Sequence, residues 1–255
     1  MARLRAAGCV WAEEEAALLA GAARFPEHLD GLVAARVRGV PLEQLVGWAE
    51  FRGLRVGVVP GVFVPRRRTA LLVDLAGDLL VGQPLVVDLC CGTGAVGLAV
   101  VTEHPDVELH AADVDPVATA CAAANLGGRG RVHTGDLYDA LPRGLAGRVD
   151  VLLCNAPYVP SDAVSTMPPE ARDHEPRTAL DGGEDGVDLH RRVAAGAPEW
   201  LAPGGALVVE TSRVQAPLTL AACESAGLTA RVVTDDDLDA TAVVATRSVD
   251  STSYA

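Results

Sequence analysis

The chain has 255 residues, 49% of them hydrophobic and 22% charged, which excludes a largely disordered protein and suits one large domain with an appendage. Asp and Glu outnumber Lys and Arg by 34 to 21, and the resulting net charge of −13 repels nucleic acid at long range. No apolar run approaches the ~20 residues that a membrane-spanning helix needs. The acidic run Glu13–Glu15 stands where a signal peptide would have its apolar segment. We therefore expect a soluble, cytoplasmic protein with no membrane partner.

The cysteines and the charged runs do not have the spacing of metal sites. The six cysteines are scattered, without a Cys-x-x-Cys pair or a Cys/His cluster, so we expect reduced thiols and no bound metal. The acidic run Asp235–Asp237 is interpreted as a solvated turn. The basic run Arg66–Arg68 could grip an acidic partner, but in so acidic a chain it is better explained as an exposed helix start.

The first part of the chain has a helical composition, rich in Ala, Leu and Glu and interrupted by Gly and Pro. Three helices are predicted there, at Ala12–Ala23, Pro26–Arg38 and Leu42–Val46. They form a small helical region, residues 1–53, which is short for an independent domain.

A change of pattern follows this helical region. Between Leu54 and Pro65 valines alternate with Gly and Arg around Pro60 and Gly61, which predicts a β-hairpin. Residues 54–68 are therefore interpreted as a hairpin linker and residues 69–255 as the main domain.

The main domain alternates short apolar strands with helices. Helices are predicted at Thr69–Val81, Ala95–Val101, Pro116–Leu126, Val187–Leu201 and Val214–Ser225. Strands are predicted at Leu85–Leu89, Val107–Ala112, Arg131–Thr134, Val149–Cys154, Ala206–Glu210, Thr229–Val233 and Ala242–Thr246. This alternation indicates a parallel sheet with helices on both faces, and the short link between the last two strands makes them antiparallel. The predicted fold is α/β, a doubly wound, mostly parallel seven-stranded sheet with an antiparallel last strand.

A glycine-bearing turn, Asp88–Gly97, follows the first strand of the main domain. Gly92 and Gly94 let the backbone approach a ligand closely, and the free N–H groups of the following helix favour an electron-rich partner. Asp113 ends the next strand, where an acidic side chain reaches ribose hydroxyls in nucleoside-binding folds. With Asp136, these residues predict a nucleoside pocket beyond the carboxyl ends of the strands.

Two alternatives to this interpretation of the turn stay open. Gly92–Gly97 satisfies the Gly-x-Gly-x-x-Gly pattern, so a dinucleotide cofactor has to be considered. Asp88 and the reversed last strand argue against a dinucleotide site. The glycines could also serve packing alone.

The tetrapeptide Asn155–Tyr158, Asn-Ala-Pro-Tyr, follows an apolar strand directly and carries the second chemical pattern. The Asn155 side-chain oxygen and the Ala156 carbonyl could accept both hydrogens of a planar N–H₂ group. Pro157 fixes the backbone, and Tyr158 offers a flat face and a hydroxyl. An amide nitrogen is a poor nucleophile, so holding it at near-attack distance is the help a protein can best give. A simple Asn-x-Pro turn that closes a strand is the alternative.

Taken together, these residues resemble the class I S-adenosylmethionine (AdoMet) methyltransferases with a Rossmann-like fold. Within that class the chain is similar to the HemK-like protein-(glutamine-N5) methyltransferases over most of its length. Besides the glycine turn and the Asn-Ala-Pro-Tyr tetrapeptide, the resemblance rests on segments in the family's order: Leu4–Gly8, Pro41–Phe51, Val64–Arg66, His174–Gly183 and Asp185-Gly186.

The resemblance implies AdoMet as methyl donor, S-adenosylhomocysteine as product, and no metal. It assigns catalysis to Asn155, Pro157 and Tyr158, with Ala156 joining them in substrate binding. It implies a cofactor site formed by Asp88, Cys90, Gly92, Gly94, Asp113, Asp136, Leu137 and Asn155. The acceptor would be a glutamine in a protein such as a translation factor or a ribosomal protein, recognised by residues 1–53, with nucleic acid disfavoured.

The chain departs from the family pattern at three places. Ala156 stands where the family usually has Pro, and a related branch with a small residue there has no assigned substrate. Ala70 replaces an acidic residue that follows the threonine equivalent to Thr69, and the helical region is shorter than the family's. An adenine N6 methyltransferase, a small-molecule N-methyltransferase and an inactive AdoMet-binding module therefore remain alternatives.

Overall fold

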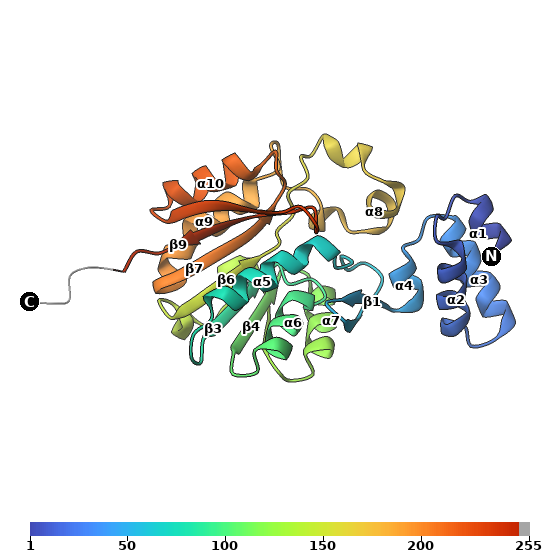
Figure 1. Ribbon diagram of the computed structural model, residues 1–255, viewed down its shortest axis with the longest axis horizontal. Coiled ribbons are helices and arrows are strands. Elements are labelled where there is room, and N and C mark those ends of the chain that lie inside the picture. The colour runs from blue at the N-terminus through green and yellow to red at the C-terminus, as the bar shows by residue number, and fades with distance from the viewer. Residues whose placement is uncertain (250–255) are drawn as a thin grey trace, which may run out of the picture.

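The protein is represented by a computed structural model that describes residues 1–249. Its centre is a seven-stranded sheet in the order β5-β4-β3-β6-β7-β9-β8, in which β9 runs antiparallel to both of its neighbours (Figure 1). The other strand pairs are parallel, so the predicted α/β architecture with a reversed last strand is confirmed. The strands are β3 (Leu85–Leu89), β4 (Glu108–Asp113), β5 (Arg131–Thr134), β6 (Val149–Cys154), β7 (Leu201–Thr211), β8 (Thr229–Asp235) and β9 (Ala240–Thr246).

Helices cover both faces of this sheet, as a doubly wound fold requires. Alternate residues of β3 enter opposite cores: Val86 belongs to one apolar cluster and Val87 to the other. The Val86 cluster includes side chains of α5 (Ala70–Leu79), α6 (Ala95–Glu103) and α7 (Pro116–Leu126). The Val87 cluster includes side chains of α9 (Asp188–Trp200) and α10 (Ala216–Ser225).

Local sequence fixes the ends of the helix that follows β4. The Asp115 side chain accepts a hydrogen bond of 2.8 Å from the N–H of Val117, and Pro116 occupies the first helical position of α7. Gly127 ends the helix in the left-handed conformation that glycine adopts most easily. These caps hold α7 directly after Asp113, one of the predicted cofactor residues.

The first helices pack around a small core of their own at one end of the molecule (Figure 1). Leu4, Leu19 and Leu32 contribute to it, and it is a separate cluster from the two that cover the sheet. Helices α2 (Ala12–Ala22), α3 (Pro26–Val37) and α4 (Leu42–Val46) lie close to their predicted bounds, whereas α1 (Ala2–Ala6) was not among the three predicted helices.

The hairpin between these helices and the sheet lies earlier than predicted. Strand β1 (Trp48–Phe51) pairs with β2 (Leu54–Gly57), so the expected hairpin over residues 54–65 was wrong. Arg52 and Gly53 form its two-residue loop with φ of 51° and 75°, the left-handed pair typical of such hairpins. The division of the chain at residues 53 and 68 stays a prediction, although its first boundary falls inside this hairpin loop.

The segment between β6 and α9 has structure that the sequence did not predict. It contains helix α8 (Pro169–His174) and the short 3₁₀ turns η4 (Ala163–Thr166) and η5 (Arg177–Ala179). A single bridge joins Val159 to Asp181 and folds the segment back onto its own start. Other 3₁₀ turns are η1 (Arg67–Thr69), η2 (Leu137–Ala140) and η3 (Arg143–Leu145). In residues 1–249, no helix combines the length and apolarity needed to span a bilayer.

Candidate active site

A cavity of about 490 Å³ opens beyond the carboxyl ends of β3, β4 and β6, a volume within the usual range for small-molecule sites. Of the predicted cofactor and acceptor residues, all but one line it: Asp88, Cys90, Gly92, Asp113, Asp136, Leu137, Asn155, Ala156, Pro157 and Tyr158. The exception is Gly94, which packs against α7. A Cβ there would lie 2.9 Å from the Ala122 Cβ, so Gly94 serves helix packing at a φ of 74°.

Backbone-to-carboxylate hydrogen bonds hold the glycine turn at one end of the cavity. The N–H of Gly92 donates to Asp113 Oδ2 at 2.9 Å, and the N–H of Gly97 donates to Asp88 Oδ2 at 3.0 Å. The second Asp113 oxygen accepts the N–H of Asp115 at 3.0 Å. Each carboxylate therefore shapes the turn as well as facing the cavity.

Carboxyl groups gather at this end of the cavity, where Asp88 is buried and Asp113 is partly buried. Burial raises the pKa of Asp88 to about 7, and burial also raises the pKa of Asp113, against the opposing effect of its backbone hydrogen bonds. Asp136 lines the same region and pairs with Arg192 at 2.7 Å. A ligand that brings a positive charge and hydroxyl donors would offset the cost of burying the Asp88 and Asp113 carboxylates.

Two hydrogen-bond acceptors are available at the other end of the cavity. The Asn155 Nδ2 donates to Thr69 Oγ1 at 3.2 Å, which leaves the amide oxygen for another partner. Neither Asn155 Oδ1 nor the Ala156 carbonyl accepts a hydrogen bond from any residue between 1 and 249. Both residues line the cavity, so a planar N–H₂ group could meet both acceptors.

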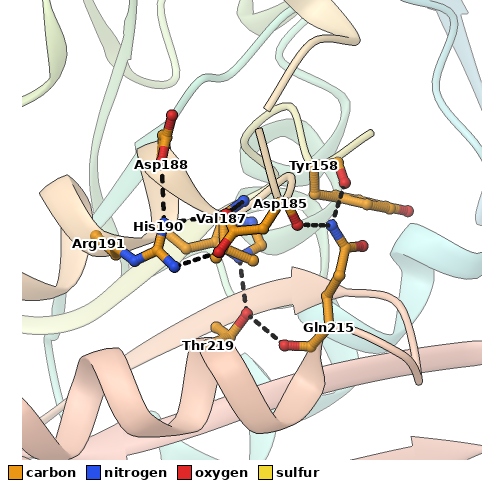
Figure 2. A network of polar contacts seen from close by, with 8 residues as sticks. All are labelled: Tyr158, Asp185, Val187, Asp188, His190, Arg191, Gln215 and Thr219. Atoms are coloured by element: carbon orange, nitrogen blue, oxygen red, sulfur yellow. Dashed lines mark hydrogen bonds and ion pairs between the residues drawn. The ribbon is translucent and has the colours of Figure 1, made fainter. Parts of the chain in front are cut away.

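Tyr158 is held from several sides by residues that the sequence analysis did not select. Its hydroxyl donates to Glu210 Oε1 at 3.1 Å, and the same oxygen accepts from Arg68 Nε at 3.3 Å. Its carbonyl accepts from Gln215 Nε2, which also donates to the Asp185 carbonyl, as Figure 2 shows. Burial and the neighbouring Glu210 raise the pKa of Tyr158, so the hydroxyl is a donor and not a base.

The loop between η5 and α9 contains Gly182, Gly183 and Gly186, and it packs directly against the backbone of the Asn-Ala-Pro-Tyr tetrapeptide. A Cβ on Gly182 would come within 2.7 Å of the Pro157 oxygen and the Tyr158 Cα. A Cβ on Gly186 would come closer still to the Tyr158 carbonyl oxygen and the Gln215 amide nitrogen. The glycines of this loop therefore permit a contact that any larger residue would block.

The basic run Arg66–Arg68 is not simply an exposed helix start. Arg66 Nη2 donates to both oxygens of the buried Glu175, at 2.6 and 2.7 Å, and Arg68 pairs with Glu210. Both arginines line the cavity. One signal could have revealed the partner of Arg68 in advance: Glu210 ends the predicted apolar strand Ala206–Glu210, at the same sheet edge as Asn155.

Comparison with known proteins finds a matching family model and several sequence relatives. Residues 55–170 match the family model described as the methyltransferase small domain. A release factor glutamine methyltransferase from Streptomyces coelicolor is 40% identical over 80% of this chain and 78% of its own length. Those from Mycolicibacterium smegmatis and Geobacter sulfurreducens are 41% and 36% identical, over 72% and 76% of this chain and 67% and 70% of their own lengths.

Solved structures agree on the fold. A methyltransferase from Pyrococcus furiosus aligns with a TM-score of 0.59 and 14% identity, over 78% of this chain and 91% of its own. A 16S rRNA N2 G1207 methyltransferase from T. thermophilus, in complex with AdoMet and guanosine, aligns with a TM-score of 0.56 and 20% identity. That alignment covers 78% of this chain and 49% of the rRNA enzyme. With the sequence relatives at 36% identity and above, the conclusion is plain: the chain belongs to the release factor glutamine methyltransferase family.

Proposed function

We propose that the protein transfers a methyl group from AdoMet to the side-chain amide nitrogen (N5) of a glutamine in a release factor. Membership of the family makes it an AdoMet-dependent methyltransferase, and the names of its relatives specify the release factor. The observation that carries the proposal is the pair of free acceptors, Asn155 Oδ1 and the Ala156 carbonyl, inside a cavity whose opposite end is acidic.

The acidic end of the cavity suits AdoMet. AdoMet carries a sulfonium, an ammonium and ribose hydroxyls, which match a site lined by Asp88, Asp113 and Asp136. Asp113 would accept the ribose hydroxyls, Asp88 would face the methionine end, and Leu137 would flank the adenine. Gly92 and Cys90 would bring the turn backbone close to the ligand. AdoMet would supply an electrophilic methyl group on a sulfonium. The thioether S-adenosylhomocysteine would leave without acid help, and the amide nitrogen would lose one proton to solvent as it gains the methyl group.

The chain's own residues would position the acceptor. Asn155 Oδ1 and the Ala156 carbonyl would each accept one hydrogen of the glutamine amide, which fixes the plane of the amide and the direction of its nitrogen lone pair. Pro157 stiffens the backbone at this point, and Tyr158 forms the adjoining wall of the cavity. The Ala156 carbonyl needs no proline at that position, so the departure from the family pattern leaves both acceptors in place.

The helical region, residues 1–53, would recognise the protein around the acceptor glutamine, and residues 69–255 would bind AdoMet. Pro41 and Glu43 from this region line the cavity together with Glu170 of α8. A protein segment that enters the cavity would therefore pass between α4 and α8 before it meets Asn155.

The alternatives are not favoured. An adenine N6 methyltransferase would use the same two acceptors for a planar amino group, but its polyanionic substrate would meet a chain of charge −13. A small-molecule methyltransferase and an inactive AdoMet-binding module find no support in the relatives, which are named as release factor glutamine methyltransferases.

The direct test uses purified protein, methyl-labelled AdoMet, and a purified release factor in its wild-type form and with each exposed loop glutamine replaced by Asn. Label on one glutamine of the wild-type factor, located by mass spectrometry and lost in one Gln→Asn variant, is the expected result. Total RNA, DNA and a small-molecule extract serve as parallel acceptors. Label in one of these fractions and none in the release factor would overturn the proposal.

A further inference from the structure

Among residues 1–249, the Thr69 side chain makes one hydrogen bond, and its partner is Asn155. Thr69 is 3% exposed and lines the cavity, and its hydroxyl is 3.2 Å from Asn155 Nδ2 although 86 positions separate the two residues. Within residues 1–249, no other side chain bonds to the Asn155 carboxamide. The orientation of this carboxamide therefore depends on one hydroxyl group.

That orientation decides what Asn155 can offer an acceptor. The terminal torsion of Asn is broad, so the amide turns easily and can present either its oxygen or its N–H₂ group. With Nδ2 held by Thr69, the oxygen is the end that remains for the acceptor amide. In the opposite orientation the Thr69 hydroxyl would have to donate to the Asn155 oxygen, and the two Asn155 N–H groups would face the acceptor N–H₂ group, with which they form no hydrogen bond.

Thr69 is itself fixed from two directions through the turn η1 and the residue before it. Arg66 pairs with Glu175, whose side chain is completely buried, and the N–H of Thr69 donates to the Arg66 carbonyl at 3.0 Å. Arg68 pairs with Glu210, which also accepts the Tyr158 hydroxyl. The turn is thus tied to the residue directly after α8, to β7 and, through Glu210, to the same tetrapeptide that Thr69 contacts.

We propose that Thr69 is a positioning residue that holds the Asn155 carboxamide with its oxygen toward the acceptor nitrogen. The inference rests on the proposed function, because it concerns the geometry of methyl transfer to an N–H₂ group. Thr69 would not bind the acceptor or the cofactor itself; it would act through Asn155.

The first test compares Thr69→Val with Thr69→Ser. Valine keeps the shape of threonine and removes the hydroxyl, so we expect the single-turnover rate of methyl transfer to fall about 10- to 100-fold with an unchanged AdoMet dissociation constant. Serine keeps the hydroxyl and should restore the rate to within about threefold. Thr119→Val is the matched control, since Thr119 is also buried and hydrogen-bonded but does not line the cavity. This control should keep the wild-type rate.

A double-variant cycle with Asn155→Ala separates positioning from a general structural role. Thr69→Val should slow the wild-type enzyme and have no further effect, within about twofold, when Asn155 is already Ala. A wild-type rate in Thr69→Val, or an equal loss in both backgrounds, would overturn the inference. If Thr69→Val does not bind AdoMet, Thr69→Ala replaces it in the same cycle. The wild-type enzyme reports the proposed function independently, because it must label glutamine whatever Thr69 does.

Discussion

The two ends of the cavity are built in different ways. The cofactor end is formed by the turn Asp88–Gly97, by Asp113 and by Asp136 with Leu137. Hydrogen bonds from backbone N–H groups to carboxylates shape its turn. The acceptor end consists of the tetrapeptide Asn155–Tyr158, which side chains from distant segments hold in place. Thr69 bonds to its first residue, and Glu210 and Gln215 bond to its last. Cofactor binding should therefore depend on backbone-to-carboxylate hydrogen bonds, and methyl transfer on side chains that reach the tetrapeptide from more distant segments.

The largest effect that separates the two ends should come from Asn155→Ala. This change removes one of the two free acceptors and leaves the carboxylate-bonded turn untouched. We expect methyl transfer to fall by at least about 10³-fold, because an amide nitrogen depends on orientation for its reactivity. AdoMet affinity, measured by calorimetric titration, should change less than about threefold. Loss of both properties would show that the two ends are not independent.

Asp113→Ala should produce the next largest effect, at the opposite end. The Asp113 carboxylate holds Gly92 and Asp115 and faces the cavity, so its loss removes charged hydrogen bonds worth roughly 1.5–3 kcal/mol each. We expect AdoMet to bind about 10- to 100-fold more weakly, with a smaller change in transfer rate at saturating AdoMet. Asp106→Ala removes an equal charge from an exposed position and is the control. Equal affinities for the two variants would remove Asp113 from the ribose role.

The same contrast explains how much the sequence could predict. The alternation of strands and helices and the cofactor turn follow from local patterns in the sequence. A short apolar run that is followed by Gly or Asp predicts a strand whose carboxyl end faces a ligand. Asn155 was found in the same way, because it directly follows the apolar strand Val149–Cys154. Each of these patterns can be recognised within a single segment of the sequence.

The residues that bond to the tetrapeptide Asn155–Tyr158 could not be predicted from such local patterns. Thr69 and Gln215 contact Asn155–Tyr158 across 86 and 57 positions of sequence, so only the packing of the sheet brings them together. The hairpin was misplaced because Pro60-Gly61 is a stronger turn signal than Arg52-Gly53, whose arginine has to adopt a positive φ. The segment around α8 lacks a regular apolar period. Ion pairs such as Arg66–Glu175, and not a periodic apolar face, attach this segment to the rest of the protein.

Two glutamates of the α8 segment offer a matched test of how that segment is held over the acceptor end. Glu175 pairs with Arg66 and has a completely buried side chain, whereas Glu170 pairs with Arg36 and its side chain is 52% exposed. Glu175→Gln should lower the free energy of unfolding by about 1–3 kcal/mol, because it leaves a partly buried guanidinium without its charge partner. Glu170→Gln should change it by less than about 0.5 kcal/mol. Urea unfolding of the two variants measures both, and equal losses would mean that burial does not decide the strength of these ion pairs.

The smallest effect, and the one specific to the cofactor end, is a pH dependence that Asp88 should impose. Burial raises the pKa of Asp88 to about 7, above its value near 4 in the unfolded chain. The neutral carboxyl therefore stabilises the free enzyme at acid pH, and this stability is lost as the pH rises from about 4 through about 7. The cationic AdoMet favours the ionised carboxylate, so its affinity should instead rise through pH 7, by up to about tenfold between pH 6 and pH 8.

Titration of AdoMet across this range measures the slope, and Asp88→Asn should flatten it because the amide does not ionise. A slope that persists in Asp88→Asn would assign the pH dependence to Asp113, whose pKa burial also raises, and would exchange the roles of the two carboxylates.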